Sequence, residues 1–147
     1  KEWRAYESSK NGKAQNMFYR VALIDKFMPS TTGVMQYDHK VSESAGSGNP
    51  YFISDDINLN LIHNLTYKTS VSFGLAYTWN SYDRPTTSGG VTKKRRDTII
   101  QPRLAMRYYL KKWLSTDLTY IFRKKMSNFK SNKYVDNRVT WGVNAQF

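Results

Sequence analysis

The chain has 147 residues, of which 39% are hydrophobic and 15% aromatic, with no cysteine and a formal net charge of +12. This aromatic content excludes a disordered chain, and the lack of cysteine excludes disulfide bonds and thiolate metal sites. A membrane-spanning helix is also excluded, because it needs roughly 18 consecutive apolar residues and the longest clear apolar run is 21–24. A β-barrel stays open, because its strands need only about 9–11 residues with apolar side chains at every second position.

Alternation of apolar and polar residues predicts a single all-β domain over residues 1–147. A strand turns successive side chains to opposite faces, so a period of two gives one apolar and one polar face. The clearest example is 70–80, where Val, Phe, Leu, Tyr and Trp alternate with Ser, Gly, Ala, Thr and Asn. Pro102 counts against a regular strand at its position, because proline has no N–H for the ladder, and a β-bulge would accommodate it. In chain order, the pattern predicts a partial strand at 1–7 and full strands at 16–28, 34–42, 51–67, 70–80, 97–110, 114–125 and 133–147.

The predicted connections alternate between long and short. The long ones are 8–15, 43–50, 83–96 and 127–133, and the short ones are 29–33, 68–69 and 111–112. Outer-membrane barrels have short periplasmic turns and long outward loops, whereas a soluble antiparallel sandwich has no reason to sort its connections in this way. The parity therefore predicts an antiparallel up-and-down transmembrane β-barrel in a bacterial outer membrane, with about eight strands in this chain and a periplasmic C-terminus.

The side chains of the two predicted faces suit such a barrel. Aromatic residues near the strand ends would form its interfacial girdles. The polar face carries small residues such as Gly74, Ala76 and Gly142, which suit a crowded or water-filled interior. The predicted girdle residues are Trp3, Tyr67, Trp79, Tyr82, Trp113 and Phe147.

A first group of charged residues lies on the polar face and would point into the barrel. Its members are Arg103, Arg107, Arg123 and Arg138, less clearly Arg20, and the acidic Asp117 and Asp136. Two interpretations stay open: an internal salt-bridge network that holds the strands together, or a lumen that favours anions such as an acidic polysaccharide. Arginine suits the second role because its planar fork binds carboxylate or phosphate in a bidentate way.

A second basic group is the run Lys93-Lys94-Arg95-Arg96 on a predicted outward loop. It is either a solvated loop or a contact for anionic lipopolysaccharide. A nucleic-acid interface would mix basic and aromatic residues on one face. Because the arginines and aromatic residues fall mostly on opposite faces, nucleic acid is disfavoured as a partner.

No catalytic constellation is present. The two histidines, His39 and His63, fall on outward positions of different predicted strands and lack the spacing of metal ligands. We therefore expect no enzyme activity, no metal and no cofactor.

Short motifs in the chain carry a family resemblance. The run Tyr120-Ile-Phe-Arg-Lys-Lys-Met-Ser-Asn-Phe129, then Tyr134, Asn137-Arg138-Val139 and Phe147, resembles the C-terminal end of beta-barrel porin-2 type proteins. The run Tyr51-Phe-Ile-Ser-Asp-Asp56 also looks like that family. The resemblance implies an outer-membrane barrel associated with exopolysaccharide export or exosortase systems. The last strand also looks like the signal read by the barrel assembly machinery, at Val139, Trp141, Val143, Ala145 and Phe147.

The number of strands decides between the functional hypotheses. Family members look like larger barrels, so the chain is either a small closed barrel or the C-terminal part of a larger one, and its truncated first strand favours the latter. A closed eight-stranded barrel has an interior that side chains fill, so it would not conduct a polysaccharide. The leading hypothesis is a porin-like channel or export barrel for anionic polysaccharide, surrounded by outer-membrane lipid and lipopolysaccharide. The alternatives are a small filled barrel with a structural or adhesion role through its outward loops, and a soluble basic β-domain that binds nucleic acid.

Overall fold

The computed structural model describes residues 2–8, 12–44, 49 and 51–146, with side chains from Phe18 onward, Ser88 excepted. Within these residues the chain forms eight strands and one short 3-10 helix. They are β1 (Glu2–Ser8), β2 (Gly12–Met28), β3 (Thr31–Glu43), β4 (Tyr51–Asn64), β5 (Thr69–Ser88), β6 (Val91–Lys111), β7 (Leu114–Ser127), η1 (Lys130–Asn132) and β8 (Tyr134–Ala145). No helix in the described part of the chain is long and apolar enough to cross a membrane.

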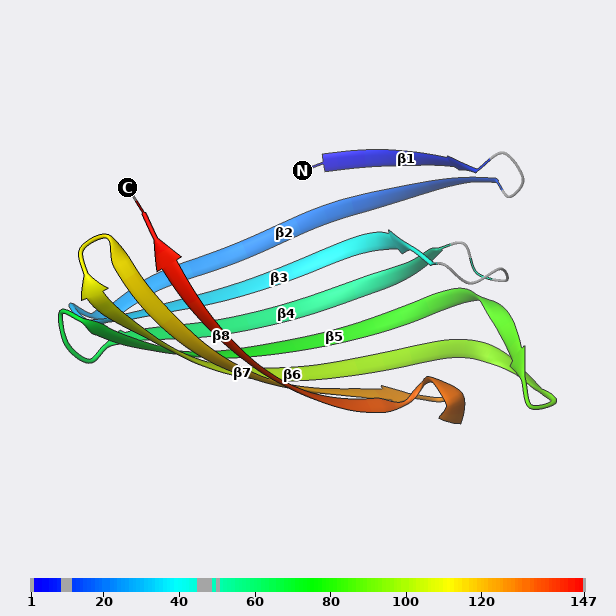
Figure 1. Cartoon of the computed structure of the whole chain (residues 1–147). Coiled ribbons are helices and arrows are strands. Elements are labelled where there is room, and N and C mark those ends of the chain that lie inside the picture. The colour runs from blue at the N-terminus through cyan, green and yellow to red at the C-terminus, as the bar shows by residue number, and fades with distance from the viewer. Residues whose placement is uncertain (1, 9–11, 45–48, 50, 147) are drawn as a thin grey trace.

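The strands follow one another across a single antiparallel sheet in the order β1-β2-β3-β4-β5-β6-β7-β8. Figure 1 shows this sheet twisted and curved into an open trough. Each strand pairs with its neighbours in the sequence, and among the described residues no ladder joins β1 to β8. This arrangement confirms the predicted all-β, up-and-down fold class, in a sheet that is not closed on itself.

The two faces of the sheet are the reverse of those in a soluble protein. The buried polar side chains in the described part of the chain are Asp38, Asn49, Ser54, Asp56, Asn80, Asp97, Ser115, Thr119 and Ser127. Large apolar side chains on the opposite face are exposed, reaching 68% for Val139 and 70% for Trp141. Leaving such a side chain in water forgoes about 1.5–3 kcal/mol, so the apolar face needs an apolar surrounding, and the polar face is the sheltered, concave one.

The register of the ladders keeps each face uniform from strand to strand. Phe73 on β5 lies opposite Leu61 on β4 and Leu104 on β6. The next residue along β5 lies opposite Asn60 and Arg103. A slip of one residue in any ladder would move charged side chains to the apolar face, so the period-two pattern of the sequence specifies this register.

Aromatic side chains border the apolar face at both ends of the strands. Tyr67 and Trp113 lie at the end with the short turns, where they are 89% and 42% exposed. Tyr77 and Trp79 lie together toward the other end, with ring centroids 5.6 Å apart. The stretch from Val71 to Trp79 spans about 27 Å along a strand, or about 21 Å across a membrane at a tilt of about 40°. This is comparable with the apolar band of about 25 Å in outer-membrane barrels.

The predicted girdle needs one correction. Tyr82 is only 7% exposed and belongs to the concave face, because it is three residues beyond Trp79 and therefore of opposite parity on β5. The side chain of Trp3 and the whole of Phe147 lie outside the described residues.

Residues 83–96, predicted as a long polar loop, belong instead to the β5–β6 hairpin, which projects beyond the other strands in Figure 1. The turn of this hairpin is Gly89-Gly90, with φ angles of 59° and 76°. Two successive residues with positive φ are typical of a type I′ turn, whose twist matches that of the flanking strands. The loop prediction was wrong because a hairpin that projects beyond the other strands can meet water on both faces, so its residues need not alternate.

Pro102 lies inside β6 without a β-bulge. The register is the same on both sides of it, since Ile100 pairs with Lys124 and Arg103 with Ile121. The ladder with β7 is interrupted between these two pairs, while Pro102 itself remains opposite Leu75 of β5. The missing N–H therefore removes local pairing with β7 and leaves the strand continuous.

Candidate functional site

The register brings the predicted arginines onto the concave face. Arg103 on β6 and Arg138 on β8 both lie opposite Ile121 of β7, so the three residues form one row across the sheet. Arg107 lies opposite Asp117 in a parallel row nearer the short turns. Residues far apart in the sequence thus share one surface because consecutive strands are antiparallel neighbours.

A hollow of about 240 Å³, here called the inner hollow, opens on this surface. It is lined by Asn60, Ile62, Ser70, Ser72, Arg103, Ala105, Met106, Arg107, Asp117 and Thr119. The small Ser70 and Ser72 of β5 border it beside the longer Arg103 and Arg107 of β6. Asp117 Oδ1 accepts a hydrogen bond of 2.5 Å from Asn144 Nδ2. This bond links the carboxylate that lines the hollow to β8.

The arginines that the sequence placed on the concave face differ in their pairing. Arg138 approaches Asp136 of its own strand at 3.8 Å, and both side chains are exposed. The other ion pairs of the described residues include neither Arg103, Arg107 nor Arg123. Within the described residues, Arg103, Arg107 and Arg123 thus lie outside the ion pairs, and both interpretations of the predicted set stay open at this point.

A network of paired charges exists on the same face, nearer the long connections, and it includes Arg20 of the predicted group. Arg20 Nε lies 2.5 Å from Asp38 Oδ1, and Lys40 Nζ lies 2.9 Å from Asp56 Oδ2. Thr78 donates a further hydrogen bond of 2.5 Å to Asp56. Sequence reasoning missed these acids, although their even-numbered positions on β3 and β4 place them on the polar side of the alternation.

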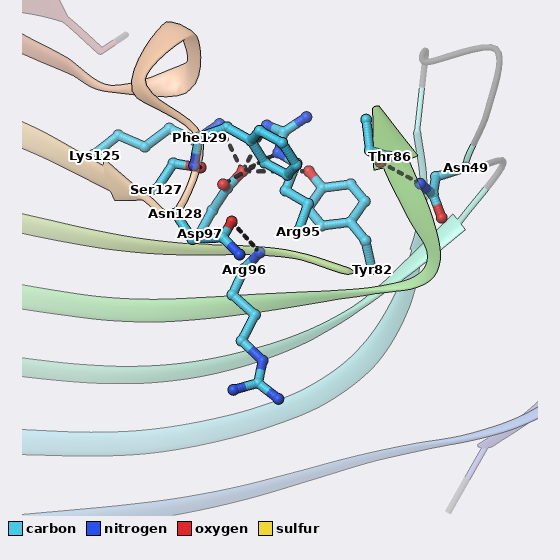
Figure 2. Close-up of polar contacts among 10 residues, drawn as sticks. All are labelled: Asn49, Tyr82, Thr86, Arg95, Arg96, Asp97, Lys125, Ser127, Asn128 and Phe129. Carbon is cyan, nitrogen blue, oxygen red and sulfur yellow. Dashed lines mark hydrogen bonds and ion pairs between the residues drawn. The ribbon is translucent and has the colours of Figure 1, made fainter. Parts of the chain in front are cut away.

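The outer rim of the concave face carries the buried carboxylate of Asp97 (Figure 2). Asp97 and its partners Arg95, Lys125 and Tyr82 are here called the rim cluster. Asp97, whose side chain is fully buried, lies 2.6 Å from Arg95 Nη2 and 3.0 Å from Lys125 Nζ. Arg95 Nε also donates a hydrogen bond of 2.9 Å to Asp97 Oδ2, and the Arg95 guanidinium lies 4.5 Å from the ring centroid of Tyr82. The cluster fastens the projecting β5–β6 hairpin to β7.

Asp97 and Arg95 stabilise each other's charged form in the rim cluster. Asp97 lies opposite Asn80, beyond the row of Trp79 and hence outside the apolar band. Burial alone would raise the pKa of the Asp97 carboxyl, but hydrogen bonds from Arg95, Ser127 and Lys125 hold it below its ordinary value. Burial alone would lower the pKa of the Arg95 guanidinium, but the hydrogen bond and charge of Asp97 raise it above its ordinary value.

The remaining members of the predicted basic loop are spread around this rim. Lys93 Nζ lies 5.0 Å from the ring centroid of the buried Phe129. Lys94 Nζ lies 3.5 Å from Asp83 in an exposed pair. Arg96 points away from the cluster, as Figure 2 shows. The run is therefore neither a loop nor one continuous basic patch, because successive strand residues face opposite sides.

Two asparagines tie the projecting hairpin to the connections on either side of it (Figure 2). Asn49 accepts from the N–H of Arg84 at 2.9 Å and donates to the same residue's carbonyl at 3.0 Å. Asn128 accepts from the N–H of Arg96 at 3.0 Å and donates to the carbonyl of Lys94 at 2.8 Å. Asn128 belongs to the Ser-Asn-Phe run that carries the family resemblance, and this pairing gives that run a structural role.

The histidines lie apart on the apolar face. His39 Nδ1 is 2.6 Å from Asp55 Oδ1, which also accepts from the Tyr37 hydroxyl at 2.7 Å. His63 Nδ1 is 2.8 Å from the hydroxyl of Thr31. Within the part of the chain that the structure describes, no group of three or more His, Cys, Asp or Glu side chains could hold a metal ion.

The predicted assembly signal lies on the last strand. Val139, Trp141 and Val143 are exposed on the apolar face of β8, and Ala145 ends the strand on the same face. The fifth residue of the predicted signal, Phe147, lies outside the described residues. The described part of the signal is therefore accessible from outside the trough.

Comparison with known proteins identifies one relationship. A protein-family model described as Putative beta-barrel porin 2 matches residues 2–147. Comparisons with curated proteins and with solved structures give no match. The family match confirms the resemblance inferred from the motifs in β4, β7 and β8.

Proposed function

Because the chain belongs to the Putative beta-barrel porin 2 family, we propose that it forms part of the wall of an outer-membrane channel that favours anions. Acidic polysaccharide is the substrate class, and passage is passive rather than catalytic. The apolar face contacts lipid, and the concave face lines the lumen. The end with the long connections faces outward.

The observation that carries this proposal is the inner hollow with its unpaired arginines. Arg103 and Arg107 line it without an ion pair among the described residues. Unpaired cations on a wall backed by lipid raise the local concentration of anions, because the low dielectric of the surroundings focuses their field. The paired charges of Arg20 and Lys40 add little to this field.

The open sheet supports a channel over a small filled barrel. A closed eight-stranded barrel requires its first and last strands to pair, and its interior is then filled by side chains. The described residues form a ladder from β1 to β8 without that pairing. We propose that a wider wall, completed by further strands, surrounds a water-filled lumen.

The outward rim and the last strand suggest the partners of this channel. Exposed Lys93, Lys94 and Arg96 lie on a hairpin beyond the Trp79 row, where the phosphates of lipopolysaccharide would meet them. The apolar alternation of β8 supports recognition by the barrel assembly machinery. The same extensive apolar face argues against the alternative of a soluble nucleic-acid-binding domain.

The test is ion selectivity in a planar bilayer. In a potassium chloride gradient, the double variant Arg103→Gln/Arg107→Gln should lose anion preference. The reversal potential should then move away from the equilibrium potential of chloride and toward that of potassium. Lys124→Gln is the control for position, because it removes a positive charge from the apolar face, and the single variants Arg103→Gln and Arg107→Gln match it in charge. A double variant with the selectivity of the wild type would contradict the proposal, as would the absence of any conductance from the wild type.

A further inference from the structure

A second hollow lies on the concave face between the paired charges and the rim. This outer hollow has a volume of about 250 Å³, equal to the liquid volume of roughly eight water molecules. It is lined by Lys40, Ser42, Phe52, Ser54, Asp56, Ala76, Thr78, Asn80, Ile99, Gln101 and Arg123. These residues come from five consecutive strands, β3 to β7, so the hollow is built on the most continuous part of the sheet.

The wall of the outer hollow leaves its own hydrogen bonding incomplete. Asn80 Oδ1 and Arg123 Nε are the buried side-chain polar atoms without a partner in the described part of the chain, and both residues line this hollow. One is an acceptor and the other a donor. A buried polar group without a partner costs about 1–3 kcal/mol, so turning either group toward a molecule in the hollow sacrifices no hydrogen bond at these two atoms.

The charges of the outer hollow fit an anion of moderate charge. Lys40 and Arg123 are cations, and Asp56 is already engaged by Lys40 at 2.9 Å and by Thr78 at 2.5 Å. One net positive charge remains at Arg123. Its guanidinium lies 5.5 Å from the ring centroid of Tyr134. Asp136 lies opposite Arg123 in the β7–β8 ladder, but the ion pairs of the described residues do not include Arg123.

We propose that the outer hollow is a binding subsite for one unit of an acidic sugar, with its carboxylate toward Arg123 and its hydroxyls toward Asn80. This rests on the proposed function and names the recognition site within it. An inorganic anion without a hydroxyl, such as sulfate, accepts hydrogen bonds only, so it would leave Asn80 Oδ1 unsatisfied. A sugar acid both accepts and donates, and the ring of Phe52 gives its C–H face an apolar surface.

Calorimetric titration of the full chain in detergent tests the subsite, with tetragalacturonate, neutral maltotetraose and inorganic sulfate as the probes. Tetragalacturonate should bind at least about tenfold more tightly than either of the other two, the value of one charge-assisted hydrogen bond. Asn80→Ala should weaken its binding about fivefold, and Arg123→Gln about tenfold or more. Arg123→Lys should restore part of the loss, because it returns the charge without the planar fork.

The controls separate this proposal from the channel function. Lys124→Gln changes the neighbouring residue on the opposite face and should leave binding unchanged, and heat-modifiable gel mobility confirms that each variant is folded. Asn80→Ala alters no charge, so it should weaken tetragalacturonate binding while anion selectivity stays intact. Equal binding of all three probes, or unchanged binding in both Asn80→Ala and Arg123→Gln, overturns the subsite. Loss of the subsite with selectivity still dependent on Arg103 and Arg107 would leave the channel proposal standing.

Discussion

Replacing Asp97 by asparagine should destabilise the protein more than any other single charge change on the β5–β6 hairpin. The side chain of Asp97 is 0% exposed, and those of its partners Arg95 and Lys125 are only 20% and 16% exposed. Asparagine fills the same space but leaves two largely buried cations without a counter-ion. Removing one partner of a buried pair costs about 3–5 kcal/mol, and the residual exposure of both cations to water places the expected loss near the lower end, about 3 kcal/mol.

Urea unfolding in lipid vesicles, followed by tryptophan fluorescence, measures this loss in free energy. Asp83→Asn is the matched control on the same hairpin, because its pair with Lys94 at 3.5 Å is 65% and 61% exposed. Exposed pairs contribute about 0–1 kcal/mol, so the control should scarcely move. If Asp97→Asn costs no more than Asp83→Asn, the assignment of Asp97 as the anchor of the hairpin is wrong. A double-mutant cycle with Lys125→Met then apportions the coupling between the two side chains.

Three further outcomes follow from the same geometry. The pKa of Asp97 is held below its ordinary value of 3.8. Its stabilisation is therefore present above that pH and is lost as pH falls through the lower folded-state pKa. The difference in unfolding free energy between wild type and Asp97→Asn should be constant from neutral pH to about pH 5 and shrink below about pH 4. Asn128→Ala removes both side-chain hydrogen bonds to the β6 backbone, so amide exchange at Arg96 should accelerate while that of the spanning rows stays slow, and uniform exchange rates across β6 would contradict this. Val139→Arg places a charge on the lipid face and should cost about 2–4 kcal/mol, whereas Thr140→Arg on the concave side of the same strand should cost much less; equal costs would show that the faces are assigned wrongly.

The order of the strands and the identity of their two faces were predictable because both depend on local information. A period of two is visible in any stretch of eight to ten residues, and antiparallel neighbours joined by short turns leave little freedom in topology. Phe73 and Arg103 could therefore be assigned to opposite faces before any contact was known. The β5–β6 hairpin was misjudged because outside the membrane the alternation that reveals a strand is no longer required.

The partner of each charge was not predictable, because it depends on register between strands and on how the sheet curves. Asp97 meets Arg95 two residues away, but it also meets Lys125, and that contact exists only because β6 and β7 pair with their observed offset. The outer hollow likewise combines side chains from five strands whose spacing in the sequence carries no signal of their proximity. The sequence by itself determined a two-faced membrane sheet, since alternation is a property of one strand at a time. Only the tertiary structure decided which charges are neutralised and which remain free on the concave wall, since that depends on distances of a few ångströms between strands.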